Sequence, residues 1–345
     1  MKHTAASLLR SQDEKHARRL SACMQVAHGA GGSAVSLYAQ KSPDGTTRAH
    51  FSGLITCQST WCCPDCASRI AEDRRKELND LLSWARSRGH RVVMLTLTAR
   101  HNKKTALKPF LADLKDAAKA LRQSTEWREL GLIGNVAATE VTHGANGFHP
   151  HQHILMIFPA SVGDAVEKVE RLRARWLHVL KNYARNGNQA AFHVQSADAA
   201  GDYIAKFGPA EEMALQSVKE GRKGSRTPWQ LLRDATHGDR QAGVLFREYA
   251  AAFKGRVQLQ WSRGLKKLLA EETEESGDDE PEPEKILLRQ WHSGSLSWAR
   301  ARRRMVAILR AAESGGCIDA AERGKTDSER WRDLAPDGQV LEAVA

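Results

Sequence analysis

Three histidines at alternate positions are the residues of this sequence best suited to chemistry. His149, His151 and His153 belong to the segment FHPHQH, which runs directly into the apolar stretch ILMIF. Side chains alternate between the two faces of a β-strand, so His151 and His153 share a face on which two imidazoles can hold a divalent metal ion. His149 has the same parity but precedes Pro150, where the strand is barely established. We therefore treat His149 as a candidate residue that would orient the metal-binding side chains without itself binding the ion.

A carboxylate in the preceding segment could complete this site. Glu140 lies in VAATEVT, which a Gly-rich loop connects to the histidine segment. If the two segments pair as a hairpin, Glu140 can face the histidines. Two neutral imidazoles and one carboxylate leave positions for a phosphate oxygen and water, which suits Mg²⁺ or Mn²⁺ in phosphoryl chemistry. We predict His151, His153 and Glu140 as ligands of a catalytic Mg²⁺ or Mn²⁺.

A tyrosine with a lysine three residues away is a candidate nucleophile. In the segment GDYIAKF, Tyr203, Lys206 and Phe207 fall on one face of an expected helix. A nearby cation lowers the pKa of a phenol and neutralises charge on an attacked phosphate. Attack by Tyr203 on DNA would exchange one phosphodiester for another as a 5′-phosphotyrosine, so a nicked strand could be rejoined without ATP.

Four cysteines within ten residues indicate a second metal site. They lie in CQSTWCCPDC, at positions 57, 62, 63 and 66. The spacing Cys63-x₂-Cys66 lets two thiolates reach one tetrahedral Zn²⁺ ion. We expect a cytoplasmic protein, in which cysteines stay reduced and clustered ones are more often metal ligands than disulfides.

The elements that must position these residues alternate between strands and helices. The expected strands cover 91–98, 132–142, the histidine segment and 192–195, and the expected helices cover 67–88, 105–122, 165–183 and 197–207. This order predicts an α+β fold, with an antiparallel sheet and helices packed on one face.

The charge of the chain favours a polyanionic partner. The sequence has 52 Lys and Arg against 41 Asp and Glu, a formal net charge of +11. Nine of the acidic residues and none of the basic ones lie in 271–284, so the remainder is more basic still. Nucleic acid is the commonest partner of such a surface.

We divide the chain into three parts. Residues 1–90 form an N-terminal zinc-binding and DNA-contacting region whose first 22 residues we expect to be loosely ordered. Residues 91–269 form the domain with the histidines and the tyrosine, and 270–345 an acidic linker and a basic helical tail, with a helix over 296–309. The chain has no apolar stretch of about 20 residues and its N-terminus lacks the apolar core of a secretory signal, so we expect no membrane partner.

Three motifs in one order resemble those of rolling-circle replication initiators of bacterial plasmids, members of the HUH endonuclease superfamily. Residues 95–98 (LTLT) are similar to the first motif, 149–153 (HPHQH) to the metal motif and 203–207 (YIAKF) to the tyrosine motif. Segments 225–229, 254–256 and 261–266 are also similar, so the resemblance covers roughly residues 20–269 and makes 91–269 an HUH endonuclease domain.

The resemblance implies an enzyme that nicks one strand of a plasmid origin. The metal at His151, His153 and Glu140 would polarise the scissile phosphate, Tyr203 would attack it and Lys206 would offset the developing charge. The freed 3′-OH would prime a host polymerase. The partner would be origin DNA in the bacterial cytoplasm, single-stranded or hairpin at the nick site, with a host helicase as a further candidate.

The resemblance also implies a ligand set for the zinc. Relatives show a similar cysteine pattern with an earlier cysteine upstream, which gives Cys23, Cys57, Cys63 and Cys66 as structural Zn²⁺ ligands and leaves Cys62 over. The alternative set of Cys57, Cys62, Cys63 and Cys66 places ligands at adjacent positions, which strains a tetrahedral site.

Two positions depart from the family pattern. The family normally has a hydrophobic residue between the metal histidines, where this chain has Gln152, and we expect altered sheet packing there. Some relatives carry a second tyrosine four residues after the first, where this chain has a phenylalanine. A second cleavage at termination would then use water activated by Asp202, Glu211 or Glu212, or Tyr203 of a second subunit in a homodimer.

Two basic runs are candidate DNA contacts. One directly follows the cysteines on an expected helix, and a helix anchored by zinc could read duplex DNA. The other covers 219–226. The predicted DNA-binding residues of the two runs are Arg69, Arg74, Arg75, Arg222, Lys223 and Arg226. Such phosphate contacts would give an affinity that falls steeply with salt.

Two other functions stay open at this point. A transposase or conjugative relaxase shares the chemistry, although relaxases usually carry three metal histidines and an N-terminal tyrosine. A zinc-stabilised DNA-binding regulator without catalysis would use the same cysteines and basic runs, with the histidines and Tyr203 in structural roles.

Overall fold

The computed structural model describes residues 1–28, 34–41, 45–196, 224–276 and 285–324 of the chain. Its contacts divide the chain into two units, each built from two separate segments. One unit comprises Met1–Ser21 and Gln58–Asp278, and the other comprises Ala22–Cys57 and Asp279–Ala345. Each unit therefore takes residues from more than one of the three parts expected from the sequence.

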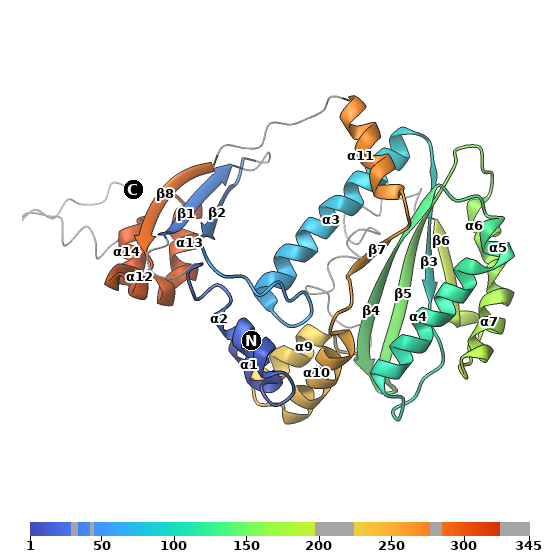
Figure 1. Cartoon of the computed structure of the whole chain (residues 1–345), viewed down its shortest axis with the longest axis horizontal. Coiled ribbons are helices and arrows are strands. Elements are labelled where there is room, and N and C mark those ends of the chain that lie inside the picture. The colour runs from blue at the N-terminus through green and yellow to red at the C-terminus, as the bar shows by residue number, and fades with distance from the viewer. Residues whose placement is uncertain (29–33, 42–44, 197–223, 277–284, 325–345) are drawn as a thin grey trace, which may run out of the picture. The chain divides into compact units, whose positions relative to one another are not determined.

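A five-stranded antiparallel sheet forms the centre of the first unit (Figure 1). Its strand order is β6–β3–β5–β4–β7. The strands are β3 (Arg91–Leu97), β4 (Gly134–Gly144), β5 (Gly147–Phe158), β6 (Phe192–Ser196) and β7 (Leu259–Trp261). Strands β4 and β5 form a hairpin in which Gly144 lies opposite Gly147 and Glu140 lies opposite His151. The predicted α+β class and antiparallel sheet are confirmed.

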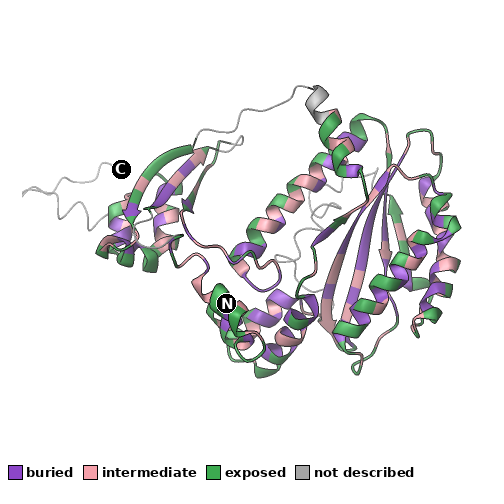
Figure 2. Cartoon of the chain, in the orientation of Figure 1, coloured by how far each residue is buried: buried purple, intermediate pink, exposed green. Residues whose placement is uncertain are grey.

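One face of this sheet is covered by three helices and two short elements. They are α4 (Leu107–Gln123), α5 (Thr125–Arg128), α6 (Ala165–Glu170), α7 (Leu172–Asn182) and the 3₁₀ helix η1 (Gln189–Ala191). In α4 the buried residues Phe110, Leu114 and Leu121 recur at helical spacing, so one side of this helix packs on the strands. Figure 2 shows the same division, with buried residues facing the sheet and exposed residues facing outwards.

Helices also cover the opposite face, so the expectation of helices on one face only is wrong. Helix α3 (Pro64–Ser87) and helix α11 (Leu265–Ser276) pack there against Val92, Val136 and Leu155. The apolar run ILMIF of β5 contains no polar residue on either face, which is the pattern of a strand covered on both sides. Residues 271–276 of the acidic segment belong to α11.

A group of four helices completes the first unit. It contains α1 (Lys2–Leu9), α2 (Glu14–Ala22), α9 (Pro228–Thr236) and α10 (Arg240–Phe253). The expectation that residues 1–22 are loosely ordered is wrong: Ala5 and Leu9 are buried, and Lys2 forms an ion pair with Asp65 at 2.7 Å. A second ion pair joins Asp13 to Lys254 at 2.6 Å.

The second unit has a smaller antiparallel sheet of order β2–β1–β8. Its core contains Phe51, Trp291 and Trp298. The expected helix over 296–309 is interrupted, because the consecutive arginines Arg302–Arg304 form a 3₁₀ segment. The elements are β1 (Ala34–Lys41), β2 (Thr47–Ser52), β8 (Lys285–His292), α12 (Leu296–Ala301), η2 (Arg302–Arg304), α13 (Met305–Glu313) and α14 (Ile318–Arg323). No helix in the described part of the chain is long and apolar enough to cross a membrane.

Candidate functional site

The register of the central strands brings the predicted metal ligands to one face of the sheet. Glu140 on β4 lies directly opposite His151 on β5. His153 lies opposite Thr96 on β3, two residues further along β5. Because side chains alternate along each strand, all four of these side chains point to the face on which α3 lies.

Contacts on both ring nitrogens orient the imidazole of His153. Its Nε2 lies 3.1 Å from Oε2 of Glu140, and its Nδ1 lies 3.0 Å from Oγ1 of Thr96. The ring is only 6% exposed. A threonine hydroxyl can both donate and accept, so it can partner either tautomer of the ring. Thr96 was missed as a site residue, although it lies in the LTLT segment and has the parity of the ligand face.

A row of histidines continues from the site along the start of β5. The ring centroids of His151 and His149 are 4.0 Å apart, and those of His149 and His101 are 4.5 Å apart. Burial and the neighbouring histidines lower the pKa of His151 to about 3, and burial and His101 lower the pKa of His149 to about 4. Both imidazoles are therefore neutral near pH 7, which is the form that binds metals. His101, from the loop after β3, was also missed.

The chemical types of the three donors suit a hard divalent cation. Two neutral imidazoles and a carboxylate are ligands that Mn²⁺ accepts, and Mg²⁺ accepts the carboxylate most readily. The ring centroids of His151 and His153 are 6.1 Å apart, and the contact of Glu140 described above is with His153. The ligand atoms of the three residues do not all lie within 4.8 Å of one another in this structure.

Four buried cysteines form the second candidate metal site. The sulfur atoms of Cys23, Cys57, Cys63 and Cys66 all lie within 4.8 Å of one another, and no other group of three or more potential ligands in the described ranges meets that condition. Cys63 is the N-cap of α3 and Cys66 lies in its first turn, so the helix N-terminus favours both thiolates. These are the four residues that the family pattern implies, and such a cluster could bind a metal such as zinc.

The adjacent cysteine has different surroundings. Cys62 is 3% exposed, and burial raises the pKa of its thiol to about 12, against a smaller opposing effect of a hydrogen bond with Ser59. Cys62 is not among the four cysteines whose sulfur atoms lie within 4.8 Å of one another. The alternative ligand set that includes Cys62 therefore does not match the cluster seen in the structure.

Two of the three candidate DNA contacts on α3 are already paired. Arg75 forms a two-bonded ion pair with Glu72, at 2.7 and 2.9 Å, and Arg74 pairs with Glu77. Arg69 is exposed near the start of the helix. Both pairs are half-buried and join residues one turn apart on the helix, so a phosphate contact by Arg74 or Arg75 would have to replace an existing ion pair.

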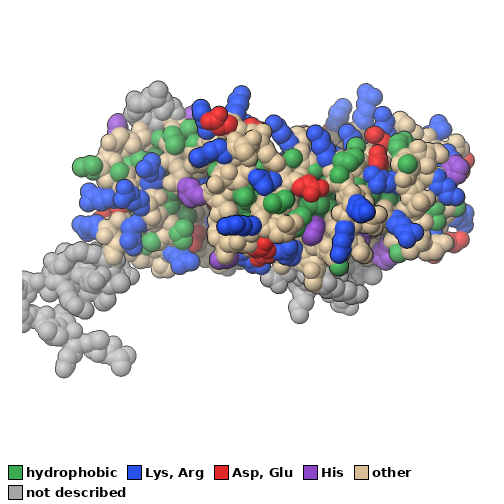
Figure 3. All heavy atoms as spheres, turned by 90° about the horizontal axis from the view of Figure 1, so that it is seen from below, with side chains coloured by type: hydrophobic (Ala, Val, Ile, Leu, Met, Phe, Trp, Pro, Cys, Tyr) green, Lys and Arg blue, Asp and Glu red, His purple; other side chains and the backbone are tan. Residues whose placement is uncertain are grey.

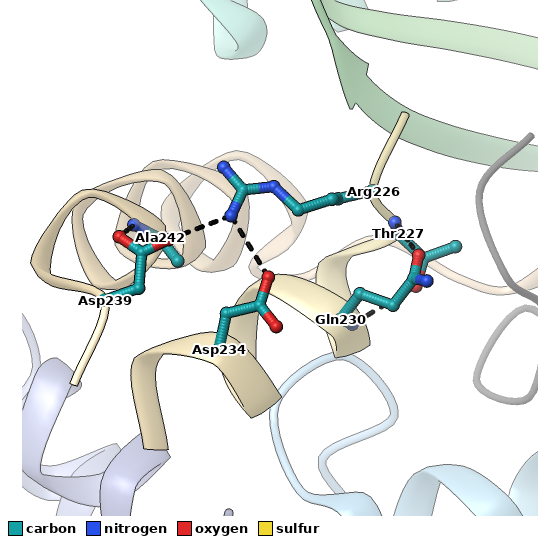
Figure 4. Close-up of polar contacts among 6 residues, drawn as sticks. All are labelled: Arg226, Thr227, Gln230, Asp234, Asp239 and Ala242. Carbon is teal, nitrogen blue, oxygen red and sulfur yellow. Dashed lines mark hydrogen bonds and ion pairs between the residues drawn. The ribbon is translucent and has the colours of Figure 1, made fainter. Parts of the chain in front are cut away.

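Arg226 holds three parts of the first unit together (Figure 4). Its Nη1 donates to Asp234 of α9 at 3.1 Å and to Asp239, the N-cap of α10, at 3.0 Å. Its backbone exchanges two hydrogen bonds with His143 at the end of β4, at 2.7 and 2.8 Å. The next residue, Thr227, caps α9 in a capping box with Gln230. This geometry assigns Arg226 a structural role, whatever its contact with DNA.

Four predicted site residues lie outside the described residues. They are Tyr203, Lys206, Arg222 and Lys223. In the sequence, the described residues before this segment end with β6, an edge strand of the central sheet, and those after it include Arg226.

The surface is rich in positive charge. On the face drawn in Figure 3, Lys and Arg side chains clearly predominate over Asp and Glu side chains. This agrees with the formal net charge of +11 for the whole chain. A polyanion would be attracted to such a surface.

The central sheet, its row of histidines and the buried cysteine cluster define a basic α+β protein with two candidate metal sites. Residues 49–299 match the model of the replication protein family Rep_1. The chain therefore belongs to this family of replication proteins.

Two curated proteins extend the comparison. The chain is 27% identical to "Protein rep" of Streptomyces lividans over 316 aligned positions, which cover 68% of this chain and 68% of that protein. It is also 27% identical to a "Neomycin resistance protein" of Streptomyces cyanogenus over 139 positions, which cover 30% of this chain and 31% of that protein. No solved structure matches the chain.

Proposed function

We propose that this protein initiates rolling-circle replication of a plasmid by nicking one strand of origin DNA and later rejoining it. The observation that supports this most is the common face of Glu140, His151 and His153 on adjacent strands, in a chain of the replication protein family. The similarity to a protein named rep in Streptomyces lividans supports the plasmid context.

In this proposal the chain uses a tyrosine to exchange phosphodiester bonds. The phenol oxygen of Tyr203 attacks the scissile phosphorus, and the 3′ oxygen leaves and takes up a proton. One P–O bond forms as another breaks, so the strand stays joined to Tyr203 through its 5′ phosphate. Lys206 offsets the charge that develops on the phosphate.

The predicted metal ligands would hold the ion that interacts with the phosphate during this attack. His151, His153 and Glu140 would bind Mg²⁺ or Mn²⁺, and the bound ion would polarise the phosphate. Thr96 keeps the His153 ring in the orientation that its hydrogen bond defines. The four cysteines would bind a structural Zn²⁺ at the start of α3 and so fix the helix that carries Arg69.

The proposed partner is plasmid origin DNA, exposed as a single strand or hairpin at the nick. Arg69, Arg74 and Arg75, together with Arg222, Lys223 and Arg226, would contribute contacts to its phosphates. The freed 3′-OH would prime a host polymerase, with a host helicase as a further partner and a second copy of the chain as a source of another Tyr203.

A covalent-adduct assay tests this proposal. Purified full-length protein is mixed with labelled single-stranded origin oligonucleotides and Mn²⁺, and the products are separated on a denaturing gel. We expect a protein–DNA adduct with the native chain and with Tyr183→Phe, a half-buried tyrosine that serves as the matched control. We expect none with Tyr203→Phe, which should still bind origin duplex normally.

The same assay separates the alternatives. A DNA-binding regulator would bind duplex DNA but form no adduct with any strand, and an adduct that persists in Tyr203→Phe would assign the nucleophile elsewhere. A transposase would form the adduct with the ends of a mobile element and not with a plasmid origin.

A further inference from the structure

A pocket on the sheet face opposite the histidines has no part in the nicking reaction. Its volume is about 660 Å³, which falls in the range of small-molecule sites. Helix α4, the strands β4 and β5, and the segment 251–257, which comprises the end of α10 and the residues that follow it, line the pocket. Gln152 and Thr139, a directly opposed pair on the two strands, reach it from the sheet. Strand alternation turns His151 to the other face.

The side chain of Gln152 points to a ligand. This residue is 5% exposed, and its Oε1 has no hydrogen-bond partner among the described residues. A buried carbonyl without a partner destabilises the folded chain, and such groups are rare in native proteins. A ligand with an N–H group at this depth would supply the missing hydrogen bond.

The rim of the pocket attracts an anion. Lys108 and Lys115 lie seven residues apart on α4, and therefore on the same side of the helix, and Arg256 also lines the pocket. Neither lysine forms an ion pair within the described ranges. Asp116 is the single acidic side chain among the described residues that line the pocket, so the charge around it is positive.

Part of the pocket wall is apolar. Leu111, Leu114, Ala137 and Phe253 line it. A ligand that fits must combine a flat body of low polarity, an edge with N–H donors and a separate anionic group. A nucleotide has these three properties in its base, the edge of that base and its phosphate.

We propose that this pocket binds a nucleotide, with the edge of its base at Gln152 and its phosphate at Lys108 and Lys115. The nucleotide is either free in solution or one residue of a DNA strand that runs past the pocket. Gln152 stands between His151 and His153 in β5, so the same strand carries the pocket on one face and the candidate metal ligands on the other.

Isothermal titration of the full-length chain with nucleotides tests this site. The titrations use deoxynucleoside monophosphates, the matching nucleosides, inorganic phosphate and a short single-stranded oligonucleotide, all in buffer without added Mg²⁺ or Mn²⁺ and without a chelator, so that zinc stays bound. These titrations measure binding under conditions in which the proposed nicking reaction does not run. Their result therefore tests the pocket even if the proposed nicking function is wrong. We expect the monophosphate to bind at least about tenfold more tightly than either the nucleoside or phosphate alone.

Three variants locate the binding. Gln152→Leu and the double variant Lys108→Ala/Lys115→Ala should each weaken nucleotide binding about tenfold or more. Lys119→Ala, an exposed lysine of the same helix that does not line the pocket, should bind like the native chain. Gln152→Leu removes the unpaired carbonyl, so its melting temperature should equal or exceed that of the native chain.

The outcomes are distinct. If the pocket variants bind the mononucleotide more weakly but bind the oligonucleotide as before, the ligand is a free nucleotide. If they bind the oligonucleotide more weakly, the ligand is part of a DNA strand. The proposal is overturned if no nucleotide binds, or if both pocket variants bind nucleotides and oligonucleotide as the native chain does while remaining folded.

Discussion

Oγ1 of Thr96 lies 3.0 Å from Nδ1 of His153, on the side of the ring away from Glu140. A hydrogen bond in this position fixes the plane of the ring and the direction in which the other nitrogen points. The orientation of the candidate ligand therefore depends on a residue from a strand that lies 57 positions earlier in the sequence.

Removal of this hydroxyl should weaken metal binding while the fold is kept. We expect Thr96→Val to lose about 10–100-fold in Mn²⁺ affinity and in adduct formation, the usual effect of removing a partner behind a ligating histidine. Thr96→Ser keeps the hydroxyl and should retain most of both. Mn²⁺ binding is measured by electron paramagnetic resonance, and equal affinities of the valine variant and the native chain would contradict the role of Thr96.

Adjacent cysteines should respond in opposite ways to the same substitution. We expect Cys63→Ser to lose the bound zinc, because it removes one of four thiolates in the cluster. Cys62→Ser should keep one equivalent, since its thiol has a pKa raised to about 12 and is not part of the cluster. Metal content by mass spectrometry decides, and a native chain without zinc would refute the assignment of the cluster.

The parity of the strand residues was enough to predict that His151, His153 and Glu140 share a face, because a short hairpin fixes their register. Thr96 and His101 could not be found in this way. They reach the site through the pairing of β3 with β5, which joins residues far apart in the sequence, and a single sequence contains no signal for that pairing. The roles of Tyr203 and Lys206 stay predictions.

At the scale of the elements, the helices that pack on the sheet show where local patterns are sufficient. The amphipathic pattern of α4 predicts its bounds closely, 105–122 expected against Leu107–Gln123 found. The strand β8 was not predicted, because its neighbour β1 lies some 250 positions earlier and the pairing is formed by tertiary contacts. The order of residues 1–22 likewise depends on tertiary contacts, including the ion pair of Lys2 with Asp65.

The junction of α9 and α10 should make stability depend on pH in acid. The hydrogen bond from the backbone N–H of Ala242 and the bond from Arg226 hold the pKa of Asp239 below its ordinary value of 3.8. A carboxyl group whose pKa is lower in the folded chain stabilises the fold at pH values above its unfolded pKa. This stabilisation is lost as the pH falls through the lowered pKa of the folded state. Asp239→Asn keeps an N-cap acceptor but loses the charge.

We therefore expect the native chain to be more stable than Asp239→Asn at pH 7, and the two to converge as the pH falls below 3.8. Asp239→Ala loses the cap as well and should be less stable than Asp239→Asn at both pH values. Urea unfolding at several pH values measures these differences. A difference between the native chain and Asp239→Asn that stays constant down to pH 2 would contradict the charge-based explanation.

At the scale of the whole molecule, the positive charge should govern the affinity for DNA. The logarithm of the binding constant for duplex DNA should fall linearly with the logarithm of the salt concentration, with a slope of about −0.9 for each phosphate contacted. Arg69→Ala should reduce the magnitude of this slope by about one and should weaken binding to all DNA sequences alike. Arg171→Ala, an exposed arginine of the first unit paired with Glu167, is the matched control.

Fluorescence anisotropy at several salt concentrations gives these slopes. If Arg69→Ala and Arg171→Ala have the same slope as the native chain, the start of α3 does not contact phosphate. A slope lowered equally by both variants would indicate a general effect of charge and no local contact.

The second unit joins β1 and β2, near the start of the chain, to β8, near its end. On a ribosome that adds about 5–20 residues per second, β1 emerges roughly 12–50 s before β8. During this interval the edge of β1 is unpaired, and an open strand edge is a site for association with other chains. A message that ends before residue 285 would therefore yield a product prone to aggregate, because the smaller sheet can close only after β8 (Lys285–His292) has been translated.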